Sequence, residues 1–250
     1  MTQLTILTGA SRGMGLAMAE QLCTPDHTLL CISRGLSPSL ATLAQHKGTT
    51  LLQWQADLAQ AEAVADKLKT WLQSQNGQSF QSANLINNAG VIGHLGPMEQ
   101  ATASSVQQAL AINLAAPMLL TQVFLQTTRS WPVQRKVLNI SSGLGRRAMA
   151  ASAVYCATKA GLDHFSRSLA LDEALLANPA QVVSLAPGVI DTDMQTDLRA
   201  GNPVGFPDQA NFIHLKESGS LTSPAAAAAR VLGFLARGDF GSQVVADVRD

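Results

Sequence analysis

Thr8-Gly9-Ala10-Ser11-Arg12-Gly13-Met14-Gly15 is the stretch of sequence that decides the fold of this 250-residue chain. A short aliphatic run, residues 4–8, leads into it, and a helical pattern, residues 13–22, follows. Glycines let the backbone turn tightly and approach a pyrophosphate, whose charge is met by free N–H groups and the positive end of the helix. With a strand before it and a helix after it, the loop predicts a dinucleotide-binding site, and a plain turn is the alternative.

Along the rest of the chain, short aliphatic runs alternate with longer helical patterns. The runs are almost continuously apolar, which is typical of parallel strands with helices on both faces. We expect strands at residues 4–8, 28–33, 51–55, 85–87, 137–141, 182–186 and 244–245. We expect helices at residues 13–22, 59–74, 104–113 continuing through 117–128, 152–176 and 224–236. The alternation predicts a single-domain α/β Rossmann fold, a doubly wound, parallel, seven-stranded sheet with helices on both faces.

The composition fits one compact domain spanning residues 1–250. Hydrophobic residues make up 46% and charged residues 14% of the chain, which excludes intrinsic disorder and a coiled coil. Basic and acidic residues number 17 each, so no net charge favours nucleic acid or an anionic membrane as a partner. One long stretch with little periodicity, residues 191–222, contains several glycines and prolines, and we expect it to form a substrate lid.

The cysteines and the apolar runs indicate in which cellular compartment the protein is found. Cys23, Cys31 and Cys156 are an odd set at no metal-ligand spacing, which argues against a disulfide framework and against a metal site. A reducing, cytoplasmic setting is therefore expected. A strand-like run begins close to Met1, which leaves no basic leader with a cleavage site, and no apolar run reaches the ~18 residues that a membrane span needs. We expect neither export nor a membrane anchor.

The end of the second predicted strand indicates which nicotinamide cofactor binds. A carboxylate there would hydrogen-bond the ribose hydroxyls of NAD and repel a 2′-phosphate. This chain has Ser33-Arg34 instead, with no carboxylate nearby. Arg34 can hold a phosphate by a charged bidentate contact, and Arg12 in the glycine loop is placed to help, so NADP(H) is the predicted cofactor. Two ordinary surface arginines are the alternative.

The chain has a single tyrosine, Tyr155, and Lys159 follows it four residues later, which places both side chains on one face of a helix. A phenol with an ordinary pKa of about 10 is a poor acid at neutral pH, and a nearby cation should lower that pKa by favouring the phenolate. The pair therefore suits proton donation to a carbonyl oxygen that receives a hydride. Ser142, at the end of a predicted strand, would polarise the same oxygen, and Ser141 competes for this role.

Together these motifs resemble the short-chain dehydrogenase/reductase family. Residues 8–15 are similar to its T-G-x-x-x-G-x-G loop, and the serine, tyrosine and lysine are similar to its catalytic set. The family pattern places the active hydroxyl just before small loop residues, here Gly143-Leu144-Gly145, which selects Ser142. Asn113 matches a fourth catalytic member, which in the family helps to hold a water-linked proton relay to the lysine.

The resemblance also implies a set of cofactor contacts. Asp57-Leu58 corresponds to the contact to the adenine ring, Asn87-Asn88-Ala89-Gly90 to the motif that steadies the sheet, and residues 187–192 to the segment that contacts the nicotinamide. As bare sequence, each is equally compatible with a helix cap or a turn. The implied cofactor-binding residues are Gly9, Ser11, Arg12, Gly13, Met14, Gly15, Ser33, Arg34, Asp57, Leu58, Asn88, Ala89, Gly90, Tyr155, Lys159, Pro187, Gly188, Ile190 and Thr192.

Several segments are similar to the sepiapterin reductase and (S)-benzoin-forming benzil reductase branch of the family. They are residues 85–90, 139–143, 155–156, 186–195 and 215–219. The resemblance implies that NADPH reduces one carbonyl of a small α-dicarbonyl substrate, with Tyr155 as the proton donor. The implied substrate contacts are Ser142, Tyr155, Gly188 and Asp247. Asp247 matches the carboxylate that anchors the pterin in sepiapterin reductases, and a surface acid near the chain end is an equal alternative.

The expected walls of the substrate pocket are mostly apolar, which suits an aryl or alkyl ketone. They are residues 93–98 and 148–154 together with Val204, Phe206, Phe212 and Ile213, and the polar exceptions are His94, Arg199 and His214. Two other functions stay open. A dehydrogenase of another substrate range that oxidises alcohols is disfavoured because the second strand lacks a carboxylate at its end. A non-catalytic NADP-sensing protein is disfavoured because the tyrosine and the lysine are both present.

The resemblance implies a homodimer built on the predicted helices 104–128 and 152–176. Their small, apolar residues are equally consistent with ordinary core packing. The frequent C-terminal Asp-Gly-Gly of the family is replaced by Asp247-Val248-Arg249-Asp250, which puts the usual tetramer-forming tail in doubt.

Overall fold

The computed structural model describes residues 2–202 and 204–250. At its centre, seven parallel strands form one sheet in the order β3-β2-β1-β4-β5-β6-β7. The strands are β1 (Thr2–Thr8), β2 (His27–Ser33), β3 (Thr50–Gln55), β4 (Phe80–Asn87), β5 (Gln134–Ile140), β6 (Gln181–Ala186) and β7 (Val245–Asp247). The predicted doubly wound α/β fold is confirmed.

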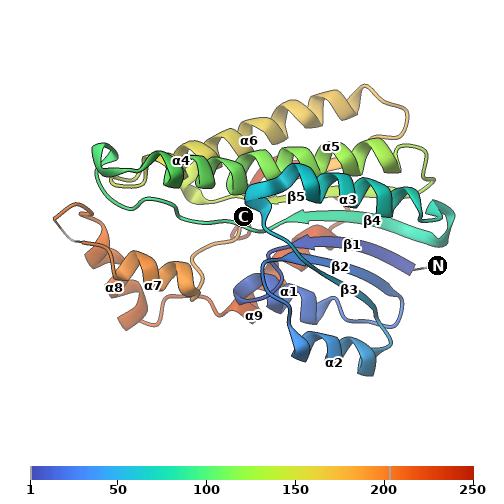
Figure 1. Ribbon diagram of the computed structural model, residues 1–250, viewed down its shortest axis with the longest axis horizontal. Helices are drawn as coiled ribbons and strands as arrows, with labels where there is room; N and C mark the ends of the chain where they lie inside the picture. The colour runs from blue at the N-terminus through green and yellow to red at the C-terminus, as the bar shows by residue number, and fades with distance from the viewer. Residues whose placement is uncertain (1, 203) are drawn as a thin grey trace.

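Helices cover both faces of the sheet (Figure 1). One layer contains α1 (Gly13–Gln21), α2 (Pro38–Lys47) and α9 (Pro224–Ala236), and the other contains α3 (Ala61–Gln73), α4 (Ala103–Leu110), α5 (Ala116–Thr128) and α6 (Ala153–Ala174). Leu7 packs in the core under the first layer, while its neighbour Ile6 packs in the core under the second. Because side chains alternate along a strand, two buried faces require strands that are apolar at nearly every position.

The direction in which the chain crosses the sheet changes between β1 and β4. From β1 the chain moves outward through β2 to β3, and it then returns to β4, which is hydrogen-bonded to β1 on the other side. At such a switch point the loops that follow the two central strands part, which leaves a crevice at the carboxyl end of the sheet. The glycine loop follows β1 and therefore lies at this crevice.

The sequence patterns do not predict α2, although the structure shows clear signals at both of its ends. Ser37 caps the helix by accepting a hydrogen bond from the Leu40 N–H at 3.2 Å, and Pro38 occupies the first turn. Gly48 ends it in the left-handed conformation, with φ 71°. Only Leu40 and Ala44 of the helix are buried, so its apolar stripe is faint.

The stretch 191–222 is not irregular, as the sequence suggested, but contains two short helices. They are α7 (Asp193–Arg199) and α8 (Gln209–Glu217), which extend beyond the carboxyl end of the sheet (Figure 1). Helix α7 is only two turns long and α8 has no buried residue, so neither gives a clear apolar period. Residue 203, within this stretch, lies outside the described residues.

Helices α4 and α5 form one continuous stretch, Ala103–Thr128, joined by the π-helical turn Ala111–Ala115. An 18-residue window of it has a mean hydropathy of 1.5, so by length and composition alone this one helix could cross a membrane, although no uninterrupted apolar run reaches that length. Within the fold, 56% of that window is buried. The helix is apolar because it packs on the sheet and on neighbouring helices.

Candidate active site

The glycine loop after β1 is so closely packed at Gly9 and Gly15 that no side chain would fit at either position. Gly9 has φ +72°, and a Cβ on Gly15 would lie 2.0 Å from the Gly9 carbonyl oxygen. A Cβ on Gly9 would lie 2.9 Å from the Cα of Ala89, which follows β4. Among the described residues, no side chain caps the first N–H groups of α1, so the positive end of this helix is open to an anion. The loop therefore has the form of a phosphate cradle.

Polar bonds join the ends of the two central strands beneath this loop. The Thr8 hydroxyl accepts hydrogen bonds from the backbone N–H groups of Asn88 (2.9 Å) and Ala89 (3.0 Å). In return, Asn88 Nδ2 donates to the Thr8 carbonyl at 2.9 Å. Behind them, Asn87 Nδ2 donates to Asn139 Oδ1 of β5 at 2.8 Å. These bonds hold β1, β4 and β5 in register at the floor of the crevice.

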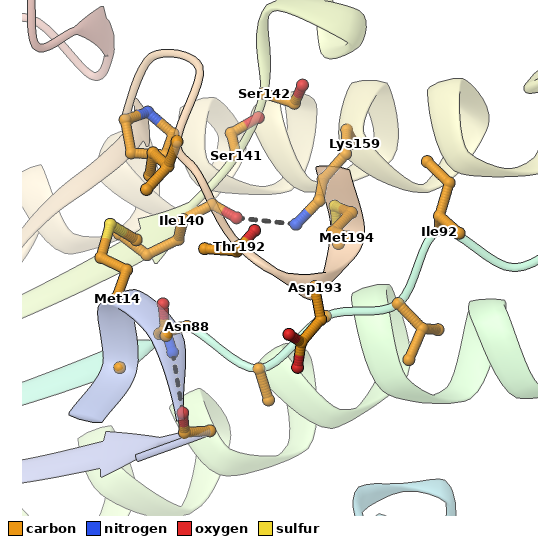
Figure 2. A pocket seen from close by; sticks show the side chains of 18 of the residues that line it. Met14, Asn88, Ile92, Ile140, Ser141, Ser142, Lys159, Thr192, Asp193 and Met194 are labelled. Carbon is orange, nitrogen blue, oxygen red and sulfur yellow. Dashed lines mark hydrogen bonds between the residues drawn. The ribbon is translucent and has the colours of Figure 1, made fainter. Parts of the chain in front are cut away.

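A cavity of about 440 Å³ runs along the carboxyl ends of the strands, and Figure 2 shows part of its wall. All but one of the residues predicted as catalytic groups or as cofactor or substrate contacts line it: Gly9, Ser11, Arg12, Gly13, Met14, Gly15, Ser33, Arg34, Asp57, Leu58, Asn88, Ala89, Gly90, Ser142, Tyr155, Lys159, Pro187, Gly188, Ile190, Thr192 and Asp247. The exception is Asn113, which lies behind the wall. The topology thus gathers, at one edge of the sheet, residues that are scattered over almost the whole sequence.

One end of the cavity lies beyond β2, where the sequence predicts the adenosine half of the cofactor. The Arg34 side chain is exposed there and forms no ion pair with any described residue. Asp57 uses Oδ1 to accept a hydrogen bond from the Ala59 N–H at 2.9 Å, and Leu58 beside it is buried. Arg34 is therefore an available cation at this end of the cavity.

Arg12, which the sequence assigns to a phosphate, is engaged elsewhere. Its Nη1 forms an ion pair at 2.8 Å with Oδ2 of Asp193, the first residue of α7. A Cβ on the neighbouring Gly13 would lie 3.4 Å from Thr192 Cγ2, so glycine loop and lid approach each other here. Both side chains of the pair are more than 60% exposed, so it stabilises the fold by at most about 1 kcal/mol. No sequence pattern shows a contact between residues so far apart.

Tyr155 and Lys159 lie one turn apart on the buried side of α6. Lys159 Nζ donates a hydrogen bond to the Ile140 carbonyl at 2.7 Å (Figure 2), and it stands 5.7 Å from the centre of the Tyr155 ring. Burial lowers the pKa of Lys159 to about 8, and the carboxylate of Asp163 acts in the opposite direction. The ammonium is therefore only weakly held in its charged form.

The Tyr155 phenol differs from the sequence expectation in its pKa. Burial raises the pKa of Tyr155 to about 12, although a hydrogen bond with Ser142 acts to lower it. The expectation that Lys159 lowers the pKa of this phenol is therefore wrong for this structure. The lysine ammonium is directed to the Ile140 carbonyl instead. The phenol consequently keeps its proton at neutral pH.

Ser142 follows β5 and precedes the 3-10 turn Gly143–Gly145. Its Oγ accepts a hydrogen bond from the Leu144 N–H at 3.1 Å, and the same hydroxyl acts to lower the pKa of Tyr155. The competing Ser141 lines the cavity too, but its hydroxyl is buried without a hydrogen-bond partner among the described residues. The structure thus brings Ser142 together with the phenol.

Asn113 is fully buried in the π-helical turn between α4 and α5. Its side-chain amide bonds twice with the backbone of Val91, accepting from the N–H and donating to the carbonyl, each at 2.8 Å. Gly90 separates it from Lys159: a Cβ there would lie 3.4 Å from Asn113 Oδ1 and 3.8 Å from Lys159 Nζ. Asn113 therefore fixes the chain after β4 close to the lysine.

The sequence of this chain matches a known protein family. The family model described as short chain dehydrogenase matches residues 3–203, most of the chain. The chain belongs to the short-chain dehydrogenase family. It is therefore an oxidoreductase that acts on carbonyl or hydroxyl groups of a small molecule with a nicotinamide cofactor.

Among individual proteins, this short-chain dehydrogenase is similar to benzil reductases and sepiapterin reductases. It is 35% identical over 235 residues to a benzil reductase ((S)-benzoin forming) of Bacillus cereus, with 94% of each chain covered. It is 32% identical over 243 residues to a sepiapterin reductase of Xenopus tropicalis, which covers 93% of this chain and 90% of the relative. A crystal structure of a short-chain dehydrogenase/reductase from Burkholderia vietnamiensis matches over the full length of both chains, with 32% identity and a TM-score of 0.65. The resemblance to the benzil and sepiapterin reductase branch is confirmed.

The substrate side of the cavity in this short-chain dehydrogenase is apolar, and of the wall residues that the sequence suggested only Phe212 lines it. The residues lining it are Ile92, Leu144, Met194, Leu198 and Phe212, which belong to one cluster around Tyr155. The expected segments 93–98 and 148–154 stand outside the lining, and Val204 is 92% exposed. Phe206 is buried beneath Phe212, and Ile213 does not line the cavity. Helix α7 takes the expected place of the loops, because residues 191–222 fold into helices.

The three polar exceptions also lie away from the lining. His94 bonds through Nε2 with the Pro97 carbonyl at 2.9 Å, and neither Arg199 nor His214 lines the cavity. A position on a loop near a strand end is too weak a signal to place such side chains.

Asp247 is buried at the end of β7 and is not a surface acid. Arg249 donates to both of its oxygens, Nε to Oδ1 at 2.7 Å and Nη2 to Oδ2 at 2.6 Å, and this contact lowers the pKa of Asp247. The charge of the carboxylate expected to anchor a substrate is therefore already balanced by Arg249.

Arg147, in the loop after Ser142, also lines the cavity. Sequence reasoning missed Arg147, Arg249 and Asp193, although each follows the carboxyl end of a strand, where ligands bind in such sheets.

Proposed function

We propose that this protein is an NADPH-dependent carbonyl reductase that transfers hydride to one carbonyl of an α-dicarbonyl compound or a related apolar ketone. The observation that carries the proposal is the meeting of Ser142, Tyr155 and Lys159 in one cavity, between a phosphate cradle and an apolar wall. The names of the relatives, benzil reductase and sepiapterin reductase, support the same class of substrate.

The residues present fit the proposed cofactor. The space between Gly9, Gly15 and Ala89 is one that any side chain would fill, and the open end of α1 faces it. NADPH, when bound, supplies the hydride. Arg34 would hold its 2′-phosphate through a charged bidentate contact, which a chain with a carboxylate at this position could not offer. The segment from Pro187 to Thr192 would hold the nicotinamide end.

In this proposal the protein's own groups bind the carbonyl oxygen and move one proton. The hydroxyls of Ser142 and Tyr155 bind the oxygen, and the phenol gives its proton to that oxygen as it becomes negative. Burial raises the pKa of the phenol to about 12, so the phenol carries its proton at neutral pH and gives it up only to the developing alkoxide, which is a stronger base. The ammonium of Lys159 stabilises the phenolate that remains, and Asn113 keeps the backbone beside the lysine in place.

The state of Asp247 favours diketones over pterins as substrates. A pterin ring offers hydrogen-bond donors that would need a free carboxylate, and Arg249 already occupies both oxygens of this one. An aryl or alkyl diketone needs no such anchor and gains free energy by burial against the apolar wall.

Three further features belong to this proposal. Residues 191–222 act as the substrate lid of a single domain.

The chain forms a homodimer through α4, α5 and α6, where Leu110 and Leu171 are 40% and 71% exposed. Gel filtration with light scattering measures the oligomeric state directly. The free cysteines suit a reducing compartment, the cytoplasm.

The direct test follows the oxidation of NADPH and of NADH by absorbance, with benzil, a small aliphatic diketone and sepiapterin as substrates. We expect turnover of a diketone with NADPH, about tenfold or more slower turnover with NADH, and slower turnover of sepiapterin. Tight NADPH binding without turnover of any of the three would overturn the substrate class. Equal rates with the two cofactors would overturn the role of Arg34.

A further inference from the structure

Asp163 is a buried carboxylate that the proposed chemistry does not use. It lies one helical turn after Lys159 on α6 and is 1% exposed. A carboxylate in such a place is unfavourable unless charges or hydrogen bonds compensate for the lost water. The groups that surround it therefore indicate what it does.

Three elements meet at Asp163. From β6, the Ser184 hydroxyl donates a hydrogen bond to Oδ1 at 2.7 Å. From the loop after Ser142, Arg146 Nε stands 3.5 Å from Oδ2, and this oxygen accepts no hydrogen bond from any described residue. On α6 itself, Lys159 is the cation one turn away, and the carboxylate acts to raise its pKa. Oδ1 is thus fixed by a hydrogen bond, while the carboxylate charge acts on two cations, Arg146 and Lys159.

Arg146 also ties the same loop to the last strand. Its Nη2 donates to the Ala246 carbonyl of β7 at 2.6 Å. Gly145 lets the loop come down onto the helix, because a Cβ there would lie 2.8 Å from Asp163 Oδ2 and 3.0 Å from the Lys159 carbonyl oxygen. The loop that begins at Ser142 is therefore seated on the turn of α6 that bears Lys159.

We propose that Asp163 and Arg146 are positioning residues of the active site, which seat the Ser142 loop on α6 and set the charge that Lys159 experiences. This inference rests on the proposed function only in taking Lys159 and Tyr155 as the proton-transferring pair. Neither Asp163 nor Arg146 touches the substrate; both act through the lysine and the loop.

The two charges act on Lys159 with opposite sign. The groups that face its ammonium are the Ile140 carbonyl from β5, Asn113 from the π-helical turn and Tyr155 from α6, and of these only the phenol titrates. Loss of the Asp163 charge removes a nearby anion, so the ammonium becomes less stable and the pKa of Lys159 falls. Loss of the Arg146 charge leaves Asp163 uncompensated, so the ammonium becomes more stable and the pKa of Lys159 rises.

The experiment is a titration of Lys159 by NMR in the whole protein with NADP⁺ bound. The ¹³Cε signal of this lysine is assigned by its disappearance in Lys159→Arg. We expect Asp163→Asn to lower the pKa of Lys159 by about one unit and Arg146→Gln to raise it by about half a unit. With an active substrate, the alkaline limb of the pH profile of kcat/KM should move in the same two directions.

Glu173→Gln is the matched control. Glu173 is another buried acid on α6, paired with Arg129 and fourteen residues from Lys159, about 20 Å along the helix. This variant should lower the melting temperature and leave both the lysine titration and the pH profile unchanged. A purely structural role of Asp163 would give the same result as this control and would overturn the proposal.

Other outcomes also decide the question. Shifts of the same sign in Asp163→Asn and Arg146→Gln would overturn the proposal, because they would show that the two charges do not oppose each other. If Asp163→Asn does not fold, Arg146→Gln on the surface loop decides alone, and an unchanged lysine titration overturns the inference. If the wild type reduces no carbonyl, the proposed function fails, while the lysine titration still tests the charge balance.

Discussion

Tyr155 is the residue at which chemistry and binding can be separated. Tyr155→Phe removes one oxygen and keeps the ring that packs with Leu144 and Leu198. We expect kcat to fall by about 100-fold or more, because the general acid is lost, while the Kd for NADPH stays within about twofold. Steady-state NADPH oxidation gives the first quantity and a fluorescence titration the second. Near-normal turnover, or equal loss of binding and turnover, would contradict the assigned role.

Arg34 is the residue on which cofactor choice depends. Arg34→Ala removes a free cation from the end of the cavity, and a charged hydrogen bond of this kind contributes about 1.5–3 kcal/mol. We expect NADPH to bind about 10- to 100-fold more weakly and NADH to bind as before. Isothermal titration with both cofactors measures this. Arg230→Ala, at an exposed position on α9, is the matched control and should change neither affinity. Equal weakening of both cofactors would place Arg34 away from the 2′-phosphate.

At the scale of elements, the lid helix α7 is connected to the glycine loop by the Arg12–Asp193 pair. Asp193→Asn breaks the pair, frees Arg12 for the cofactor's phosphates and removes a negative charge from the cavity wall. We expect NADPH to bind about two- to fivefold more tightly at low salt, with this gain lost at high salt. The melting temperature should change by less than about 2 °C, because exposed pairs contribute little to stability. Weaker NADPH binding would contradict this, because it would show that the intact Arg12–Asp193 pair helps to hold the bound cofactor.

At the scale of the whole molecule, buried His27 couples stability to pH. It lies on β2, hydrogen-bonds through Nε2 with the Thr5 hydroxyl at 2.9 Å, and burial lowers its pKa to about 4. The unfolded chain takes up a proton near pH 6.5 and the folded chain only near pH 4, so stability falls as pH falls through this window. The total loss is about 3 kcal/mol.

Denaturant unfolding between pH 7 and pH 4 measures this dependence. His27→Gln should flatten the curve, while His46→Gln, at an exposed position on α2, should leave it as in the wild type. A wild-type slope that persists in His27→Gln would assign the pH dependence to other groups, such as Glu173, whose pKa its partner Arg129 lowers.

The sequence by itself determined the sheet, its parallel strands and the family. The continuous apolar runs have one physical cause, burial of both faces of each strand. In the glycine loop, a Cβ on Gly9 or Gly15 would meet contacts of 2.0–2.9 Å that no side chain could accept. Such signals are local or periodic. They also suffice to assign a family, because the motifs stand in a fixed order along the chain.

Only the tertiary structure decided which partners the site residues have. Arg12 pairs with Asp193, Arg249 covers Asp247 and Arg146 meets Asp163, and none of these contacts has a sequence pattern. The pKa of Tyr155 is likewise decided by burial and by the direction of the Lys159 ammonium. The physical reason is that charge interactions and desolvation depend on distances in space, which the chain sets only when loops from different strands meet at one edge of the sheet.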